Sequence, residues 1–173
     1  MFTNKHNSFK TKVLDIIDIF INQSDQSCFS EFVQNQYLSK IMQGSKDESQ
    51  QFRMKIAIMM SNTINRCSED ELKMLEMEQI LKLITSFLEA KVDSRALSVI
   101  IKNMQAFMNK LDDNSEYARM MKDLQTFKKI EDLQNDKNSE VSAISKQLFD
   151  QSSARNPYKV YGKIDMTNVN LKF

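Results

Sequence analysis

Apolar side chains recur at spacings of three and four residues along most of the chain. The first series covers residues 13–20 and the second covers residues 29–41. Because residues three and four apart share one face of a helix, each series predicts an amphipathic helix. No stretch keeps the period of two that is typical of a half-buried strand, so the pattern predicts an all-α protein.

Two longer apolar series at residues 49–66 and 96–111 predict long helices, each of which follows shorter ones. Aligning these helices pairs Asn62 with Asn103, a separation of 41 residues. That period lies within the ~40–47 residues of armadillo and HEAT repeats. A third, more polar copy follows at residues 116–151, as expected of a repeat that closes a stack. The chain is therefore predicted to form a short armadillo/HEAT-like α-solenoid of about three helical repeats.

Few residues in this chain favour turns, since it contains two glycines and one proline. Gly44 is expected to adopt the left-handed conformation that ends a helix. Ser68, followed by three acidic residues, is expected to cap the start of another helix. We expect residues 1–11 to be a flexible lead, residues 12–151 to form the repeats, and residues 152–173, around Pro157, to form an extended tail.

Composition and charge favour a soluble protein-binding role. The formal net charge is +1, with acidic and basic residues interspersed, which argues against a nucleic-acid partner. Cys28, Cys67 and the single histidine, His6, lack the spacing of a zinc site, so we expect two buried free thiols and no metal. No apolar run reaches the length of a signal peptide or a membrane span, so cytoplasmic and/or nuclear localisation without membrane insertion is expected.

Candidate catalytic groups are sparse. His6 lies at one end of the chain, and no serine or cysteine has an evident basic partner. Asp112 and Asp113 fall in a predicted turn, without the apolar surroundings that tune a carboxyl as a general acid. We therefore expect a protein that is not an enzyme and that needs no cofactor.

Two regions resemble a known family. The segment FKKIEDLQNDKNSEV at 127–141, with Leu148 and Phe149 after it, is similar to the last armadillo repeat of importin-α, in which a helix reading KIE-LQ precedes a short turn and a closing helix. The segments SNTI at 61–64 and SEDELKMLE at 68–76 resemble an inner repeat of that family. The resemblance covers residues 12–151 and corresponds to the C-terminal third of importin-α.

The resemblance implies a groove along the third helices of the repeats, where asparagine side chains bond the backbone of an extended basic peptide. Asn62 and Asn103 occupy the asparagine positions, and Ile58 and Val99 occupy the positions of the tryptophans that hold lysine side chains. Lys55 stands at the position of an acidic residue. The implied function is an adaptor for protein import into the nucleus. The alternative is a scaffold subunit of a larger assembly that has lost peptide binding, with the asparagines as ordinary polar residues of a helix face.

Two further segments are candidates for contact with partner proteins. In the tail, Tyr158, Tyr161 and Phe173 are spaced apolar anchors that either dock on a partner or fold back on the stack. At the other end, the predicted helix pair over residues 13–41 carries no polar cap of its own to close the stack. We expect the surface around Val13, Ile17 and Phe20 to be covered by another protein.

Overall fold

The computed structural model describes residues 3–45, 48–88, 92–112 and 115–155. Within these ranges every regular element is a helix and no strand occurs, which confirms the all-α prediction. The helices are α1 (Thr3–Gln23), α2 (Gln26–Gln34), α3 (Tyr37–Gly44), α4 (Gln50–Arg66), α5 (Glu69–Lys73), α6 (Met77–Ser86), α7 (Ser94–Lys110), α8 (Glu116–Asp123), α9 (Thr126–Asp132) and α10 (Ser139–Arg155), with a 3-10 turn at Leu133–Asn135.

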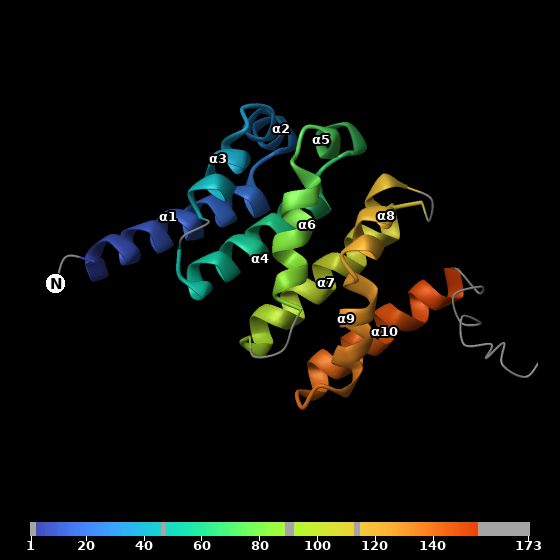
Figure 1. Ribbon diagram of the computed structural model, residues 1–173. Helices are drawn as coiled ribbons and strands as arrows, with labels where there is room; N and C mark the ends of the chain where they lie inside the picture. The colour runs from blue at the N-terminus through green and yellow to red at the C-terminus, as the bar shows by residue number, and fades with distance from the viewer. Residues whose placement is uncertain (1–2, 46–47, 89–91, 113–114, 156–173) are drawn as a thin grey trace, which may run out of the picture.

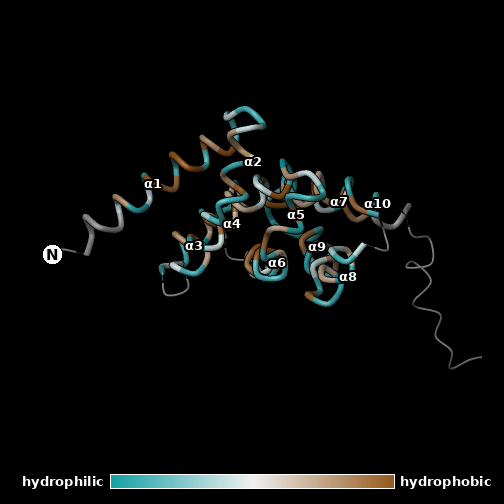
Figure 2. The backbone as a smooth tube through the Cα atoms, turned by 90° about the horizontal axis from the view of Figure 1, so that it is seen from above, coloured by the Kyte–Doolittle hydropathy of each residue, from teal (hydrophilic) through white to brown (hydrophobic). Residues whose placement is uncertain are grey.

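After α1, the order of two short helices and one long helix occurs three times. The long helices α1, α4, α7 and α10 run in the same direction across Figure 1 and form one layer. Within that layer α4 packs against α1 and α7, and α7 packs against α10. In the view from above in Figure 2, α3, α6, α8 and α9 form a second layer on one side of the long helices. The two edges of the long-helix layer are therefore α1 and α10.

One continuous core fills the space between the two layers. It extends from Ile21 in α1 to Leu148 in α10, and both side chains are buried. Methionines and branched residues of α4 and α7 occupy its centre; Met59, Met60, Ile64, Ile101 and Met104 are all almost fully buried. Thr85 of α6 and Thr126 of α9, also buried, share a hydrogen bond of 2.9 Å between their hydroxyl oxygens. Each unit thus buries its apolar surface against its neighbours.

Left-handed residues divide two of the short-helix pairs. Gln36, with φ 56°, separates α2 from α3, and Gln125, with φ 57°, separates α8 from α9. The prediction of one helix over residues 29–41 was therefore wrong. The buried Val33 and Leu38 lie five residues apart, so one extra residue interrupts the helical spacing at the break. The expectation for Gly44 was also wrong, since no described glycine has a positive φ and Gly44 ends α3 in ordinary helical geometry.

The ends of the chain differ in part from the expected boundaries. Helix α1 begins at Thr3, so residues 3–11 of the expected flexible lead are helical. The sequence did not predict this first part of α1, because residues 3–8 contain no apolar side chains at helical spacing. Helix α10 continues to Arg155, four residues into the expected tail. The tail residues Tyr158, Tyr161 and Phe173 lie outside the described residues.

The two cysteines differ in exposure. Cys67, which follows α4, is buried, and burial together with the nearby Glu71 carboxylate raises the pKa of its thiol to about 12. Cys28 in α2 is exposed, so the expectation of a buried thiol was wrong there. The position points outward because Phe29, its neighbour, fills the core side of the helix.

A buried carboxylate joins α5 to α2. Glu71 accepts a hydrogen bond from the backbone N–H of Ser68 at 2.7 Å, while the Ser68 hydroxyl accepts from the Glu71 N–H, which completes the expected cap of α5. Ser30 and Gln26 of α2 also donate to this carboxylate. Burial alone would raise the pKa of Glu71, but these hydrogen bonds outweigh it and hold the pKa below its ordinary value of 4.5.

Replacing this carboxylate is expected to weaken the junction of α2 and α5 in a pH-dependent way. A carboxyl whose pKa is lower in the folded chain stabilises the fold above its unfolded pKa, and this contribution disappears as the pH falls through the folded pKa. Glu71→Gln should cost about 1.5–3 kcal/mol at pH 7, because bonds to a charged acceptor are lost. Urea unfolding at pH 7 and at pH 3 measures the difference, which should shrink at pH 3. The exposed Glu78→Gln serves as control, and an equal loss in both variants contradicts this role.

Candidate functional site

Polar side chains connect α1 to α4 along the long-helix layer. Lys55 of α4 pairs with Asp15 of α1 at 2.5 Å. Further along the same two helices, the Asn62 amide of α4 donates a hydrogen bond to the Asp18 carboxylate of α1 at 2.8 Å. Lys55 and Asn62 are both half-buried, and the two contacts lie on the same side of the interface as helical spacing requires. Together they fix α4 against the edge helix.

The same line of contacts continues from α4 to α7. The Asn103 amide donates to the Asn62 side-chain oxygen at 2.6 Å and to the Ser61 hydroxyl at 2.8 Å. In return, the Asn65 amide donates to the Asn103 side-chain oxygen at 3.0 Å. We call Asp18, Asn62, Asn65 and Asn103 the amide network. It crosses three successive long helices without a break.

Between α7 and α10 other residue types serve the same purpose. Lys102 pairs with Glu140 at 2.9 Å, and the Gln105 amide donates to the Gln151 side-chain oxygen at 2.7 Å. The Lys102 pair is solvent-exposed, and surface pairs contribute little to stability. Every junction of the long-helix layer nevertheless carries polar contacts between neighbouring helices.

Cations at the ends of the long helices bond the carbonyl groups of the preceding helix. Arg66, the last residue of α4, donates to the carbonyls of Ile21 and Ser24 at the end of α1, and its guanidinium lies 4.5 Å from the centre of the Phe29 ring. Lys110, the last residue of α7, donates to the Asn65 carbonyl at the end of α4. A positive charge at a helix C-terminus also opposes the helix dipole. The last residue of α4 and the last residue of α7 thus make the same kind of contact with the end of the preceding long helix.

The structure brings the predicted peptide-binding residues together but engages their amides. Asn62 and Asn103 bond each other, as described above, and one turn before them lie Ile58, half-buried, and Val99, 39% exposed. Both N–H donors of Asn103 are used inside the layer. A peptide backbone would have to replace some of these bonds. Sequence reasoning missed Asp18 and Asn65, whose only signal is their position three or four residues from other polar groups on the same helix face.

The edge helix α1 presents an apolar surface to solvent. Phe9 is 67% exposed, Ile16 is 66% and Ile19 is 54%, and Val13 is also exposed. We call these four residues the α1 outer face; the apolar stretches of α1 stand out in Figure 2. Leu14 and Ile21 point the other way and are buried against the core. Ile17, which we had expected on the outer side, packs against the core.

Aromatic side chains extend the α1 outer face toward the short helices. The ring of Phe20 lies 5.3 Å from the ring of Phe32, which lies 5.5 Å from that of Tyr37. Tyr37 is exposed, and the Lys40 ammonium stands 5.7 Å from the centre of its ring. Phe20 follows Ile16 by one helical turn, so the aromatic side chains and the α1 outer face are adjacent.

The opposite edge of the layer is polar. Helix α10 buries Val141 and Leu148 against α7 and α9 and exposes Glu140, Ala143, Lys146, Gln147 and Asp150. The two edges of one layer therefore differ in chemistry. A polar outer surface at the edge of a helical layer favours contact with water, whereas an apolar outer surface favours contact with another protein.

Neither metal ligation nor membrane insertion is indicated within the described ranges. No three His, Cys, Asp or Glu side chains there gather closely enough to hold a metal ion. Among the same residues, no helix combines the length and apolarity that crossing a bilayer requires. Comparisons with protein-family models, with curated proteins and with solved structures find no match for this chain. The similarity to importin-α stays a prediction.

Removing the centre of the amide network should destabilise the fold. Asn103→Ala removes the hydrogen bonds of Asn103 to Asn62, Asn65 and Ser61, and losing hydrogen-bond partners in a partly buried site costs about 1–3 kcal/mol. Urea unfolding of the variant should show this loss. Gln147→Ala on the exposed side of α10 is the control and should change stability by no more than about 0.5 kcal/mol. If both variants unfold at the same urea concentration, the network does not hold the layer together.

Proposed function

We propose that this protein is a non-catalytic, armadillo/HEAT-like helical-repeat scaffold that binds another protein through the α1 outer face. The three successive units of two short helices and one long helix support the repeat architecture. The period of 41 residues between Asn62 and Asn103, whose side chains bond each other, gives further support. Binding to a protein and not to a small molecule follows from the extent of this exposed apolar surface, which runs along α1 from Phe9 to Ile19.

The contrast between the two edges carries this proposal. A repeat protein buries its units against one another, and the last unit at each end needs a polar outer surface to stay in solution. Helix α10 has such a surface, whereas α1 exposes four large apolar side chains in little more than ten residues. Contiguous apolar surface of this kind marks sites where proteins meet.

The spacing of these side chains indicates what covers them. Phe9, Val13 and Ile16 of the α1 outer face and the adjacent Phe20 follow one another at intervals of four, three and four residues, which is the spacing of a seam between two packed helices. Lys12 flanks this seam and is exposed, while Lys10 on the other flank is engaged with Glu48. We infer that the partner contributes an amphipathic helix with an apolar stripe and acidic residues beside it. This helix would lie against α1 as α4 does on the other side.

An importin-α-like adaptor, cytoplasmic and/or nuclear, is the second candidate. The observation that favours it is the position of Asn62 and Asn103 on neighbouring long helices, as the resemblance requires. Their amides are bonded to each other and to Asp18, however, and Lys55 on the same helix would repel a basic peptide. A scaffold needs none of these groups to be free, so it agrees better with the geometry.

Site-specific crosslinking tests the scaffold proposal. A photoreactive amino acid is placed at Ile16 on the α1 outer face, or at Ala143 on α10 as control, in the full chain within its own cells. We expect one abundant crosslinked protein from position 16 and none from position 143. The purified partner should then bind the wild type, lose at least about ten-fold in affinity with Ile16→Asp/Ile19→Asp, and keep its affinity with Ala143→Asp.

Three results would count against the scaffold. Equal crosslinking from both positions shows that the α1 outer face is not a specific surface. A crosslink to a second copy of this chain, with a dimeric mass in solution, shows self-association instead of a different partner. Saturable binding of a fluorescent basic peptide that is lost with Asn62→Ala supports the adaptor.

A further inference from the structure

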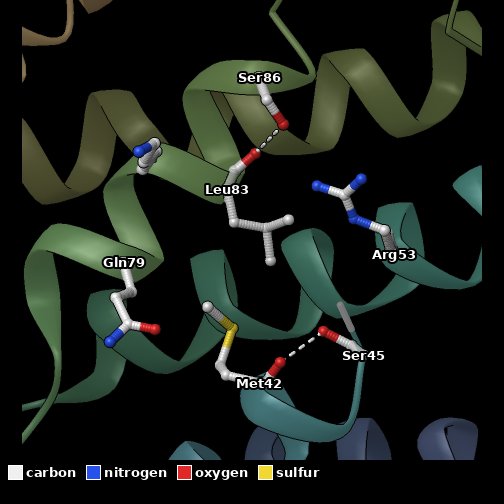
Figure 3. Close-up of a pocket in the computed structure, with 7 residues that line it drawn as sticks. Met42, Ser45, Arg53, Gln79, Leu83 and Ser86 are labelled. Atoms are coloured by element: carbon white, nitrogen blue, oxygen red, sulfur yellow. Dashed lines mark hydrogen bonds between the residues drawn. The ribbon is translucent and has the colours of Figure 1, made fainter. Parts of the chain in front are cut away.

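A cleft between α3, α4 and α6 lies away from both the α1 outer face and the amide network. Its volume is about 440 Å³, and Figure 3 shows the side chains that line it. Met42 of α3 and Leu83 of α6 supply apolar surface, and Arg53 of α4 and Lys82 and Gln79 of α6 supply polar groups. The cleft is open to solvent on one side, as Lys82 and Gln79 are exposed.

Positive charge in this cleft is not balanced. No described residue forms an ion pair with Arg53 or Lys82, and no Asp or Glu side chain is among the residues that line the cleft. Two other clefts of the described chain differ in this respect. The one between α1 and α4 contains Asp15 and Glu48, and the one between α7 and α9 with its following turn contains Asp132 and Asp136.

The two serine hydroxyls of the cleft already donate hydrogen bonds, so the two cations are the groups that attract a ligand. The hydroxyl of Ser45 donates to the Met42 carbonyl at 2.7 Å, and that of Ser86 donates to the Leu83 carbonyl at 2.6 Å. Both hydroxyl protons are thus used within their own helices. In Figure 3 the guanidinium of Arg53 extends from α4 toward the side of the cleft where Ser86 and Leu83 lie.

Comparison with the next cleft shows that the charge is specific to this one. Helix α6 lines its cleft with Gln79, Lys82, Leu83 and Ser86, and α9 with the turn after it lines the following cleft with Lys129, Asp132, Leu133 and Asp136. The spacing within each set is identical, although the second set continues past the end of α9 into the 3-10 turn. The second position is a lysine in the first cleft and an aspartate in the second. The two clefts therefore differ in charge.

We propose that the cleft between α3, α4 and α6 binds a protein segment in which an anionic side chain stands next to an apolar one. The anion, a carboxylate or a phosphate, is attracted by the positive charges of Arg53 and Lys82, and the apolar side chain rests on Met42 and Leu83. A guanidinium forms paired hydrogen bonds with either anion, and a lysine adds a second charge. This site is separate from the α1 outer face, so its test does not depend on the scaffold proposal.

Fluorescence anisotropy with three labelled peptide pools and the full-length protein tests this assignment. Each pool keeps a central Leu-X-Leu within random neutral residues, where X is Glu, phosphoserine or Gln. We expect saturable binding of the Glu pool, the phosphoserine pool or both, and none of the Gln pool. Arg53→Glu/Lys82→Glu should weaken binding at least about ten-fold. Lys128→Glu/Lys137→Glu, which makes the same change in net charge on exposed lysines, should leave binding within about two-fold.

A second measurement needs no variant and therefore does not depend on how variants fold. The wild type is treated with acetic anhydride with and without the bound peptide pool, and acetylation of each lysine is read by mass spectrometry. Lys82 should be protected by the anionic pools, and Lys128 and Lys137 should not be. Absence of binding by both anionic pools, or equal loss in the two double variants, or no protection of Lys82, overturns the proposal.

Discussion

A long helix that is apolar on two sides must be packed on two sides, and this requirement governs the whole molecule. Helices α4 and α7 satisfy it because each lies between two other long helices and above a pair of short ones. Buried residues such as Met60 and Met104 have neighbours on every side, and no single unit could bury them alone. Some polar residues between these helices are tolerated because they bond across the junction, as Asn62 does with Asp18 and Asn103.

A layer built in this way has two edges, and the outer faces of its edge helices are not covered by another long helix of the described chain. These faces are where side chains can contact a partner. Helix α10 closes one edge with charged and amide side chains, while α1 leaves apolar side chains exposed at the other. Within the layer, Asn62 and Asn103 are used for cohesion. The cleft between α3, α4 and α6 belongs to the short-helix side, where the local balance of charge varies from one unit to the next.

Most of the helices could be predicted from local sequence, because apolar spacing and capping residues act within a few positions of one another. The Ser68 cap and the two long helices ending at Arg66 and Lys110 are examples. The break at Gln36 was missed because one left-handed residue changes the spacing by a single position. The Asp18–Asn62 contact spans 44 residues and depends on how two helices are rotated against each other. The cleft around Arg53 depends on three helices and leaves no local motif.

The central claim is that α1 is an edge of the long-helix layer and that a partner protein covers its outer face. Hydrogen exchange of backbone amides, measured on the free chain and on the complex isolated from its own cells, tests it most directly. The account predicts slow exchange in α4 and α7 in both samples, faster exchange in α1 than in α4 in the free chain, and strong protection of α1 in the complex, with α10 unchanged. Protection that appears on α10, or no change in α1, would contradict it.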